Sequence, residues 1–144
     1  MQCAEIMKSE VECFRETDSI MEIARRMREV NIGFAPITDR DGRPLGTITD
    51  RDIAIRVCAE DKRASRTAAM DVMSHEAVTC RDVEDVERAE EIMSEHHKSR
   101  LMIVDDAGRL VGVLSLSDIF VEAAGEKAME TFRRIAEREV RVSV

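Results

Sequence analysis

The sequence is poor in aromatic residues: it contains no tryptophan, no tyrosine and only four phenylalanines among 144 residues. An aromatic base bound by this protein would therefore lie mainly between aliphatic side chains. Stacking on aliphatic groups is weaker than stacking on aromatic rings. The composition thus predicts modest affinity for a ligand of that kind.

Metal-binding and redox motifs are also missing. On a helix, the adjacent residues His96 and His97 would point in different directions, which makes them a poor pair of metal ligands. A chain of this length in a reducing compartment needs no disulfides, so we interpret the cysteines as free, buried thiols and predict no metal site. None of the four cysteines stands in a C-x-x-C pair: they are Cys3, Cys13, Cys58 and Cys80.

A long apolar run is absent as well. Charged residues interrupt the first ten positions, where a secretory signal needs an apolar stretch, and no later run reaches membrane-spanning length. Acidic residues outnumber basic ones, 30 against 22, which gives a formal net charge of −8. Such a surface repels a phosphate backbone and an anionic bilayer. We therefore predict a cytoplasmic protein whose main partner is neither nucleic acid nor membrane.

What the sequence does contain is an internal repeat. Residues 42–53 recur as residues 108–119, and the same constant offset links Gly46 to Gly112 without a gap. A repeat this regular indicates two copies of one supersecondary unit, each too small to bury a core alone. The two copies must then pack on each other, and we expect function where they meet.

Each copy is predicted to contain the same elements in the same order. These are a short β-prone stretch, a helix with apolar residues at helical spacing, two strands joined by a tight turn, and a closing helix. In the first copy they occupy residues 11–14, 20–30, 35–38, 45–48 and 50–59; in the second, residues 77–80, 86–93, 101–104, 110–114 and 116–124.

The predicted domain organisation follows from the repeat. We assign residues 1–62 to the first repeat and residues 63–125 to the second. Apolar residues at helical spacing in residues 126–144 predict a C-terminal helical extension. This extension covers either an edge of the core or a partner subunit, and the sequence does not choose between the two.

The motif [ST]-x-x-D stands at the junction of a strand and a helix in both copies, as Thr49–Asp52 and as Ser115–Asp118. One role is helix capping, since the hydroxyl accepts a hydrogen bond from a free backbone N–H and the acidic residue favours the positive helix end. The hydroxyl and amides also suit a phosphate, and a carboxylate binds ribose hydroxyls. A nucleotide satisfies all of these groups, and the matched second occurrence strengthens this interpretation.

These motifs, with Gly46, Gly112 and the run Ala35–Ile37, make the chain similar to a tandem pair of cystathionine β-synthase (CBS) domains over about residues 3–125. The resemblance implies an α+β fold in which two β-α-β-β-α repeats pack through their sheets, with the C-terminal helix added. It also implies two clefts for adenosine-containing ligands between the repeats, and a homodimer.

The resemblance assigns roles to single residues. Asp52 and Asp118 would bind ribose, and Thr49 and Ser115 would contact phosphate. The base would lie against the β-prone stretch of each repeat, represented by Val11 and Cys13 in the first and by Ala77 and Thr79 in the second.

Basic residues differ between the two copies. Arg51 in the first has Ser117 as its counterpart, whereas Lys98 and Arg100 in the second replace apolar residues. These side chains either point into a cleft and bind phosphate or are solvated surface charges. In the first case the two sites are unequal, and the one with more cations prefers di- or triphosphates.

The leading hypothesis is therefore a regulatory module without catalytic activity, which needs no cofactor and senses AMP, ADP, ATP or S-adenosylmethionine. His75 and the pair at residues 96–97 have no positioned nucleophile nearby in the sequence. The alternative is a ligand-free structural module that dimerises and binds an unidentified target protein.

Overall fold

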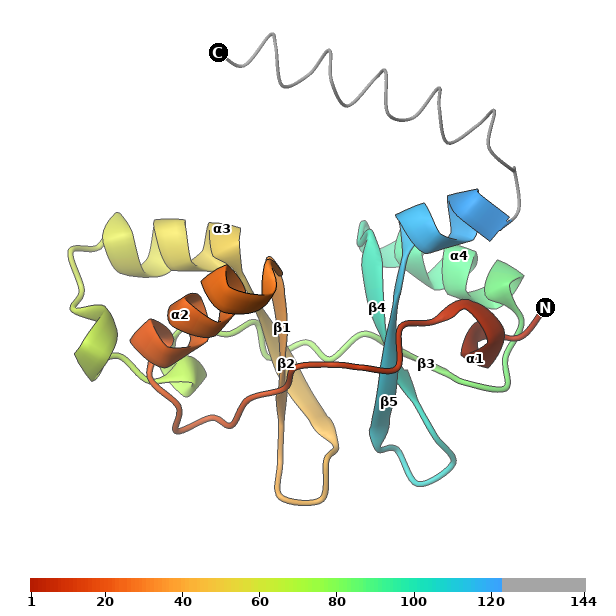
Figure 1. The fold of residues 1–144 in the computed structure, drawn as a ribbon, viewed down its shortest axis with the longest axis horizontal. Coiled ribbons are helices and arrows are strands. Elements are labelled where there is room, and N and C mark those ends of the chain that lie inside the picture. The colour runs from red at the N-terminus through yellow and green to blue at the C-terminus, as the bar shows by residue number, and fades with distance from the viewer. Residues whose placement is uncertain (123–144) are drawn as a thin grey trace, which may run out of the picture.

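Two small β-sheets lie side by side at the centre of the molecule, and helices flank each sheet on its outer side (Figure 1). This computed structural model describes residues 1–122; the predicted extension at residues 126–144 lies outside the described residues. The combination of helices with two separate sheets confirms the α+β fold that the sequence predicts.

The second half follows the predicted order of elements, and the first half follows it except for the opening strand. The first half contains α2 (Ile20–Val30), β1 (Phe34–Thr38), β2 (Pro44–Thr49), α3 (Asp50–Ile53) and a π-helical continuation, η1 (Ala54–Cys58). The second half contains β3 (Thr79–Arg81), α4 (Val86–His96), β4 (Arg100–Val104), β5 (Leu110–Ser115) and a helix at residues 116–122. Three short helices complete the described part: α1 (Cys3–Ile6) and the 3₁₀ turns η2 (Ala64–Arg66) and η3 (Ala69–Asp71).

The two sheets differ by one strand. In the second half, β4 pairs with β5 antiparallel and with β3 parallel, whereas in the first half β1 pairs only with β2. The strand predicted at residues 11–14 is reduced to a single bridge between Phe14 and Ile37. The Phe14 amide donates to the Pro36 carbonyl, and the Phe14 carbonyl accepts from the Thr38 amide. Since Pro36 has no N–H to donate, the pairing cannot continue toward the residues before Phe14. The counterpart of Pro36 in the second half, Met102, does have a backbone N–H.

Helices α2 and α4 present the apolar faces that the periodicity predicts. Ser19 caps α2, because its hydroxyl accepts from the Glu22 amide at 3.2 Å. Asn31 ends α2 in the left-handed conformation, with φ 55°, and His97 ends α4 in the same way, with φ 53°. Burial of each large side chain contributes about 1.5–3 kcal/mol to stability. The buried residues are Ile20, Ile23 and Met27 on α2 and Ala89, Ile92 and Met93 on α4.

The two repeats exchange their leading segments. Cys3 at the N-terminus is fully buried in the core of the second half, while Ala69, Val72 and Met73 are buried in the core of the first. Lys8 pairs with Val113 in β5, and at the equivalent positions of the first half Ser74 pairs with Thr47 in β2. Packing therefore joins residues from both sides of the predicted repeat boundary at residue 62, and the boundary itself stays a prediction.

The exchange explains the repeated glycines. A methyl group on Gly46 in β2 would overlap the carbonyl oxygen of Ser74, and one on Gly112 in β5 would overlap the Met7 side chain and lie 3.0 Å from the Lys8 carbonyl oxygen. Each strand is thus crossed closely by the segment from the other repeat. Only a residue without Cβ leaves room for this approach.

The cysteine prediction is half wrong. Cys3 and Cys80 are buried in the second core, but Cys13 and Cys58 are exposed. Burial raises the pKa of the Cys3 and Cys80 thiols, so the two buried cysteines are poor nucleophiles.

We expect Gly46→Ala to lower the free energy of unfolding by about 1–3 kcal/mol, because the added methyl group forces two backbone segments apart. Gly112→Ala is the matched variant and should cost less, since the flexible Met7 side chain takes up part of the overlap. Urea unfolding of both variants tests the difference. Equal losses would contradict the view that rigid backbone contact at Gly46 sets the cost.

Candidate functional site

A cleft of about 300 Å³ lies between the two halves. The segment after α1, the turn after α2 and the end of the second sheet all contribute to it. Its lining residues include Lys8, Val11, Asn31, Phe34, Pro36, Arg100, Val113, Ser115, Ser117 and Asp118. The cleft is thus shared between the repeats, where the sequence places the function.

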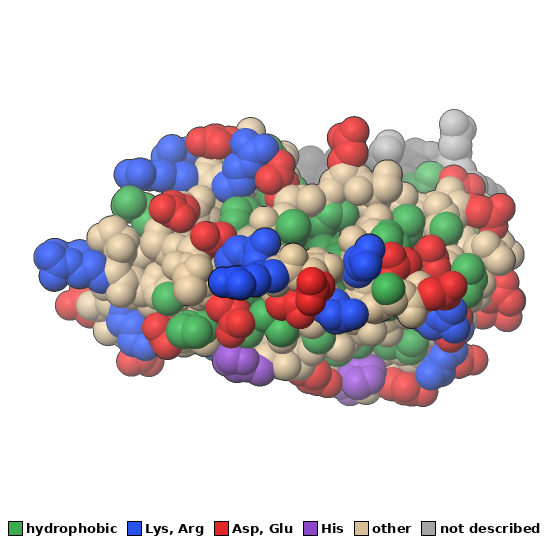
Figure 2. Space-filling model, turned by 90° about the horizontal axis from the view of Figure 1, so that it is seen from below, with side chains coloured by type: hydrophobic (Ala, Val, Ile, Leu, Met, Phe, Trp, Pro, Cys, Tyr) green, Lys and Arg blue, Asp and Glu red, His purple; other side chains and the backbone are tan. Residues whose placement is uncertain are grey.

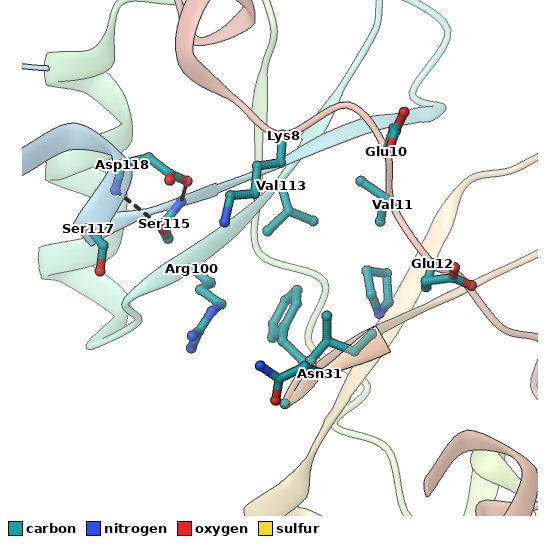
Figure 3. A pocket seen from close by; sticks show the side chains of 14 residues that line it. Lys8, Glu10, Val11, Glu12, Asn31, Arg100, Val113, Ser115, Ser117 and Asp118 are labelled. Atoms are coloured by element: carbon teal, nitrogen blue, oxygen red, sulfur yellow. Dashed lines mark hydrogen bonds between the residues drawn. The ribbon is translucent and has the colours of Figure 1, made fainter. Parts of the chain in front are cut away.

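One end of the cleft is formed by the second copy of the [ST]-x-x-D motif (Figure 3). The Ser115 amide donates to Asp118 Oδ2 at 3.0 Å, and the Asp118 amide donates to Ser115 Oγ at 3.1 Å. These reciprocal bonds form a capping box, so the predicted capping role is confirmed. They use Oδ2 and leave Oδ1 of Asp118 without a partner among residues 1–122.

The first copy of the motif has the same geometry. The Thr49 amide donates to Asp52 Oδ2 at 2.9 Å, and the Asp52 amide donates to Thr49 Oγ1 at 3.1 Å. Neither residue lines the 300 Å³ cleft, because they sit at the start of α3 in the other half.

Positive charge gathers at the Ser115 end of the cleft. Lys8 and Arg100 line the cleft from two different segments, and in Figure 3 the Lys8 side chain extends toward Ser115. The repeat offset relates them to Ser74 and Phe34, so the first copy of the motif has no matching pair of cations. On the face shown in Figure 2, acidic and basic side chains are interspersed.

Glu12 lies at the opposite end of the cleft, away from Asp118 (Figure 3). Its carboxylate accepts a 2.5 Å hydrogen bond from the Arg26 guanidinium on α2. This bond, together with the positive charge of Arg26, lowers the pKa of Glu12 below its ordinary value. The charge of Glu12 is therefore paired with Arg26, whereas Glu10 at the same end has no ion-pair partner within residues 1–122.

The predicted site residues fall into four groups. Val11, Arg100, Ser115 and Asp118 line the cleft together. Thr49, Asp52 and the exposed Arg51 lie at the start of α3, while Cys13 and Lys98 are exposed outside the cleft. Ala77 and Thr79 line a separate depression of about 270 Å³ beside α4.

Several lining residues escaped the sequence reasoning. Lys8 reaches the cleft only because the leading segments are exchanged, and the repeat gives no sign of that exchange. Pro36 lies in the predicted strand at residues 35–38 and Phe34 directly precedes it, but the composition predicts a base bound mainly between aliphatic groups. The presence of Phe34 adds one aromatic ring to the lining.

Two negative findings apply to the described part of the chain. Within residues 1–122, no three His, Cys, Asp or Glu side chains lie close enough to hold a metal ion. In the same part of the chain, no helix has the length and apolar character that crossing a membrane requires.

Comparisons with known proteins agree with this architecture. The family model of the CBS domain matches residues 3–58 and residues 69–125. The CBS domain-containing protein YhcV of Bacillus subtilis is 33% identical over 135 residues, which cover 93% of this chain and 94% of that protein.

Two solved structures are similar in fold and carry ligands. The CBS domain protein PAE2072 from Pyrobaculum aerophilum, complexed with AMP, has a TM-score of 0.77 and 30% identity, over 91% of this chain and 99% of that one. The CBS domain pair of protein MJ0100 is in complex with 5′-methylthioadenosine and S-adenosyl-L-methionine. It has a TM-score of 0.73 and 29% identity, over 83% of this chain and 96% of that one.

Glu12→Gln should lose less stability on acidification than the wild-type protein. Because the folded-state pKa of Glu12 is lowered, its ion pair stabilises the fold above the ordinary value of 4.5 and is lost as the pH falls through the folded-state pKa. Melting temperatures between about pH 6 and 3 at low salt measure the difference. Glu10→Gln is the control, since Glu10 also lines the cleft but makes no ion pair within residues 1–122. Identical acid profiles for wild type and Glu12→Gln would refute the assignment.

Proposed function

The chain belongs to the CBS-domain family, and from this premise we propose that it is a regulatory module that binds an adenine nucleotide and catalyses no reaction. The ligand lies in the cleft between the repeats, with its ribose at Asp118 and its phosphate near Ser115 and Arg100. The base lies against Val11 and its neighbours on the first half.

The observation that carries this proposal is the juxtaposition of complementary groups in one cleft. Asp118 offers a carboxylate oxygen that no residue among 1–122 occupies, which suits the two hydroxyls of a ribose. Arg100 supplies charge for a phosphate. Phe34 and Pro36 provide apolar surface for a base. A volume of about 300 Å³ is at the lower end of the range for small-molecule sites.

The similar structures support the choice of an adenosine ligand. PAE2072 is complexed with AMP, and MJ0100 with 5′-methylthioadenosine and S-adenosyl-L-methionine. Both are similar to this chain over most of its length. We extend the ligand class, not the individual ligand, to this protein.

Binding should be visible as stabilisation. At a free concentration of roughly 100 times Kd, a ligand that binds only the folded state raises the free energy of unfolding by about 2.7 kcal/mol. Thermal unfolding with AMP, ADP, ATP and S-adenosylmethionine therefore gives the ligand. A protein that none of these compounds stabilises would be the ligand-free interaction module instead.

Asp118→Ala should lose one binding event in calorimetry, and Asp52→Ala should lose a second one if the first motif also binds. Each change removes an acidic group from a first helical turn and should cost only about 0.3–1 kcal/mol of stability. Asp71→Ala, an exposed residue that does not line the cleft, is the control. If both motif variants bind the ligand as the wild type does, helix capping is the only role left for these two aspartates.

We also propose a homodimer that forms through the closing helices. Ile55 is 47% exposed, Leu116 37% and Val121 48%, so both closing helices carry apolar side chains on the surface. Light scattering at tens of micromolar should give the mass of a dimer, and the double variant Ile55→Asp/Leu116→Asp should give a monomer with an unchanged circular dichroism spectrum. A monomeric wild type would contradict the assembly.

A further inference from the structure

Lys8 takes part in two interactions at once. Its backbone pairs with β5 through two 2.9 Å hydrogen bonds, one from the Lys8 amide to the Val113 carbonyl and one from the Val113 amide to the Lys8 carbonyl. Its side chain lines the cleft and points toward the end where Ser115 lies (Figure 3). The ammonium group is therefore held at the cleft by the pairing of its own segment with β5 on the second half.

The cleft end that Lys8 and Arg100 share holds one carboxylate, that of Asp118. Neither basic side chain forms an ion pair with a carboxylate within residues 1–122, so two positive charges outnumber the one negative charge that lines this end. The Ser115 hydroxyl accepts one hydrogen bond from Asp118 and keeps its own hydrogen to donate. A phosphate group matches this set of donors and charges.

The leading segment is held on the second half by backbone hydrogen bonds and by the burial of Cys3. Its backbone bonds outside the Lys8–Val113 pair include those from the Cys3 amide to the Glu84 carbonyl, at 2.9 Å, and from the Ala4 amide to the Asp82 carbonyl, at 3.0 Å. Helix α1 has only four residues, of which Cys3 is the buried one. Because the segment is short and contributes one fully buried side chain, Cys3, to the second core, it can open locally without unfolding the rest of that core.

We propose that Lys8 couples the charge of the bound ligand to the docking of the N-terminal segment: a ligand with an anionic tail, held between Lys8 and Arg100, keeps residues 1–8 packed on the second half. This inference rests on the proposed function, because it concerns the same cleft. Linkage makes the coupling reciprocal: the factor by which docking favours binding is the factor by which binding favours docking.

The first experiment compares AMP with adenosine, which lacks the phosphate. Lys8→Ala should bind AMP about fivefold to tenfold more weakly, as expected for a partly exposed charged hydrogen bond, and should bind adenosine as the wild type does. Lys8→Arg keeps the positive charge and should keep most of the preference for AMP. Lys62→Ala, which removes an exposed lysine outside the cleft, is the matched control.

The second experiment measures docking directly. Cys3 is fully buried, so dilute iodoacetamide labels it only when the segment opens, whereas the exposed Cys13 and Cys58 serve as internal references in the same mass spectra. Saturating AMP should slow the labelling of Cys3 by at least the factor by which Lys8→Ala weakens AMP binding. Adenosine should slow it less, and Lys8→Ala should lose most of the difference between the two ligands.

The results separate this inference from the proposed function. If the wild type binds AMP while the labelling of Cys3 stays unchanged, or if Lys8→Ala keeps the wild-type ratio of AMP to adenosine affinity, the coupling is wrong and the nucleotide site remains. If the wild type binds neither AMP nor adenosine, the coupling is overturned; if ADP, ATP and S-adenosylmethionine fail to bind as well, the proposed function is overturned with it.

Discussion

The close backbone approach at Gly46 and Gly112 is the constraint on which the rest of the molecule depends. At each glycine a segment from one repeat crosses the last strand of the other, paired through Ser74 and Thr47 in the first half and through Lys8 and Val113 in the second. Each crossing segment contributes buried residues to the core of the other half of the same chain. The crossing at Gly112 also lays the chain that follows Lys8 along the cleft. Stability and the candidate site thus share one structural cause.

The capping box links local folding to ligand recognition. Ser115 and Asp118 fix each other through reciprocal hydrogen bonds of 3.0 and 3.1 Å, so their side chains are ordered before any ligand arrives. Binding then need not pay the entropy of immobilising them. The capping box engages only one carboxylate oxygen of Asp118. The other oxygen can still accept a hydrogen bond from a ribose hydroxyl.

Much of the architecture could be predicted because the repeat is gapless and its apolar spacing is clear. The helix faces led by Ile20 and Ala89, both hairpins and both capping boxes follow from local sequence alone. The exchange of leading segments could not be predicted, since the offset between the two copies is the same whichever half a segment packs on. Lys8 was missed for that reason. The extent of the strand before α2 was also misjudged, because it depends on a hydrogen bond that Pro36, far away in sequence, cannot donate.

Pro36 has a further consequence for the outline of the molecule. Its missing N–H leaves the first sheet with two strands where the second has three, and Pro36 itself faces the cleft. An open strand edge normally invites pairing by a strand from another chain, and proline at an edge prevents it. Phe14 already occupies part of the β1 edge through its two backbone hydrogen bonds, and Pro36 prevents another strand from continuing the ladder at that position. One imino acid thus limits backbone pairing along the strand edge that borders the cleft.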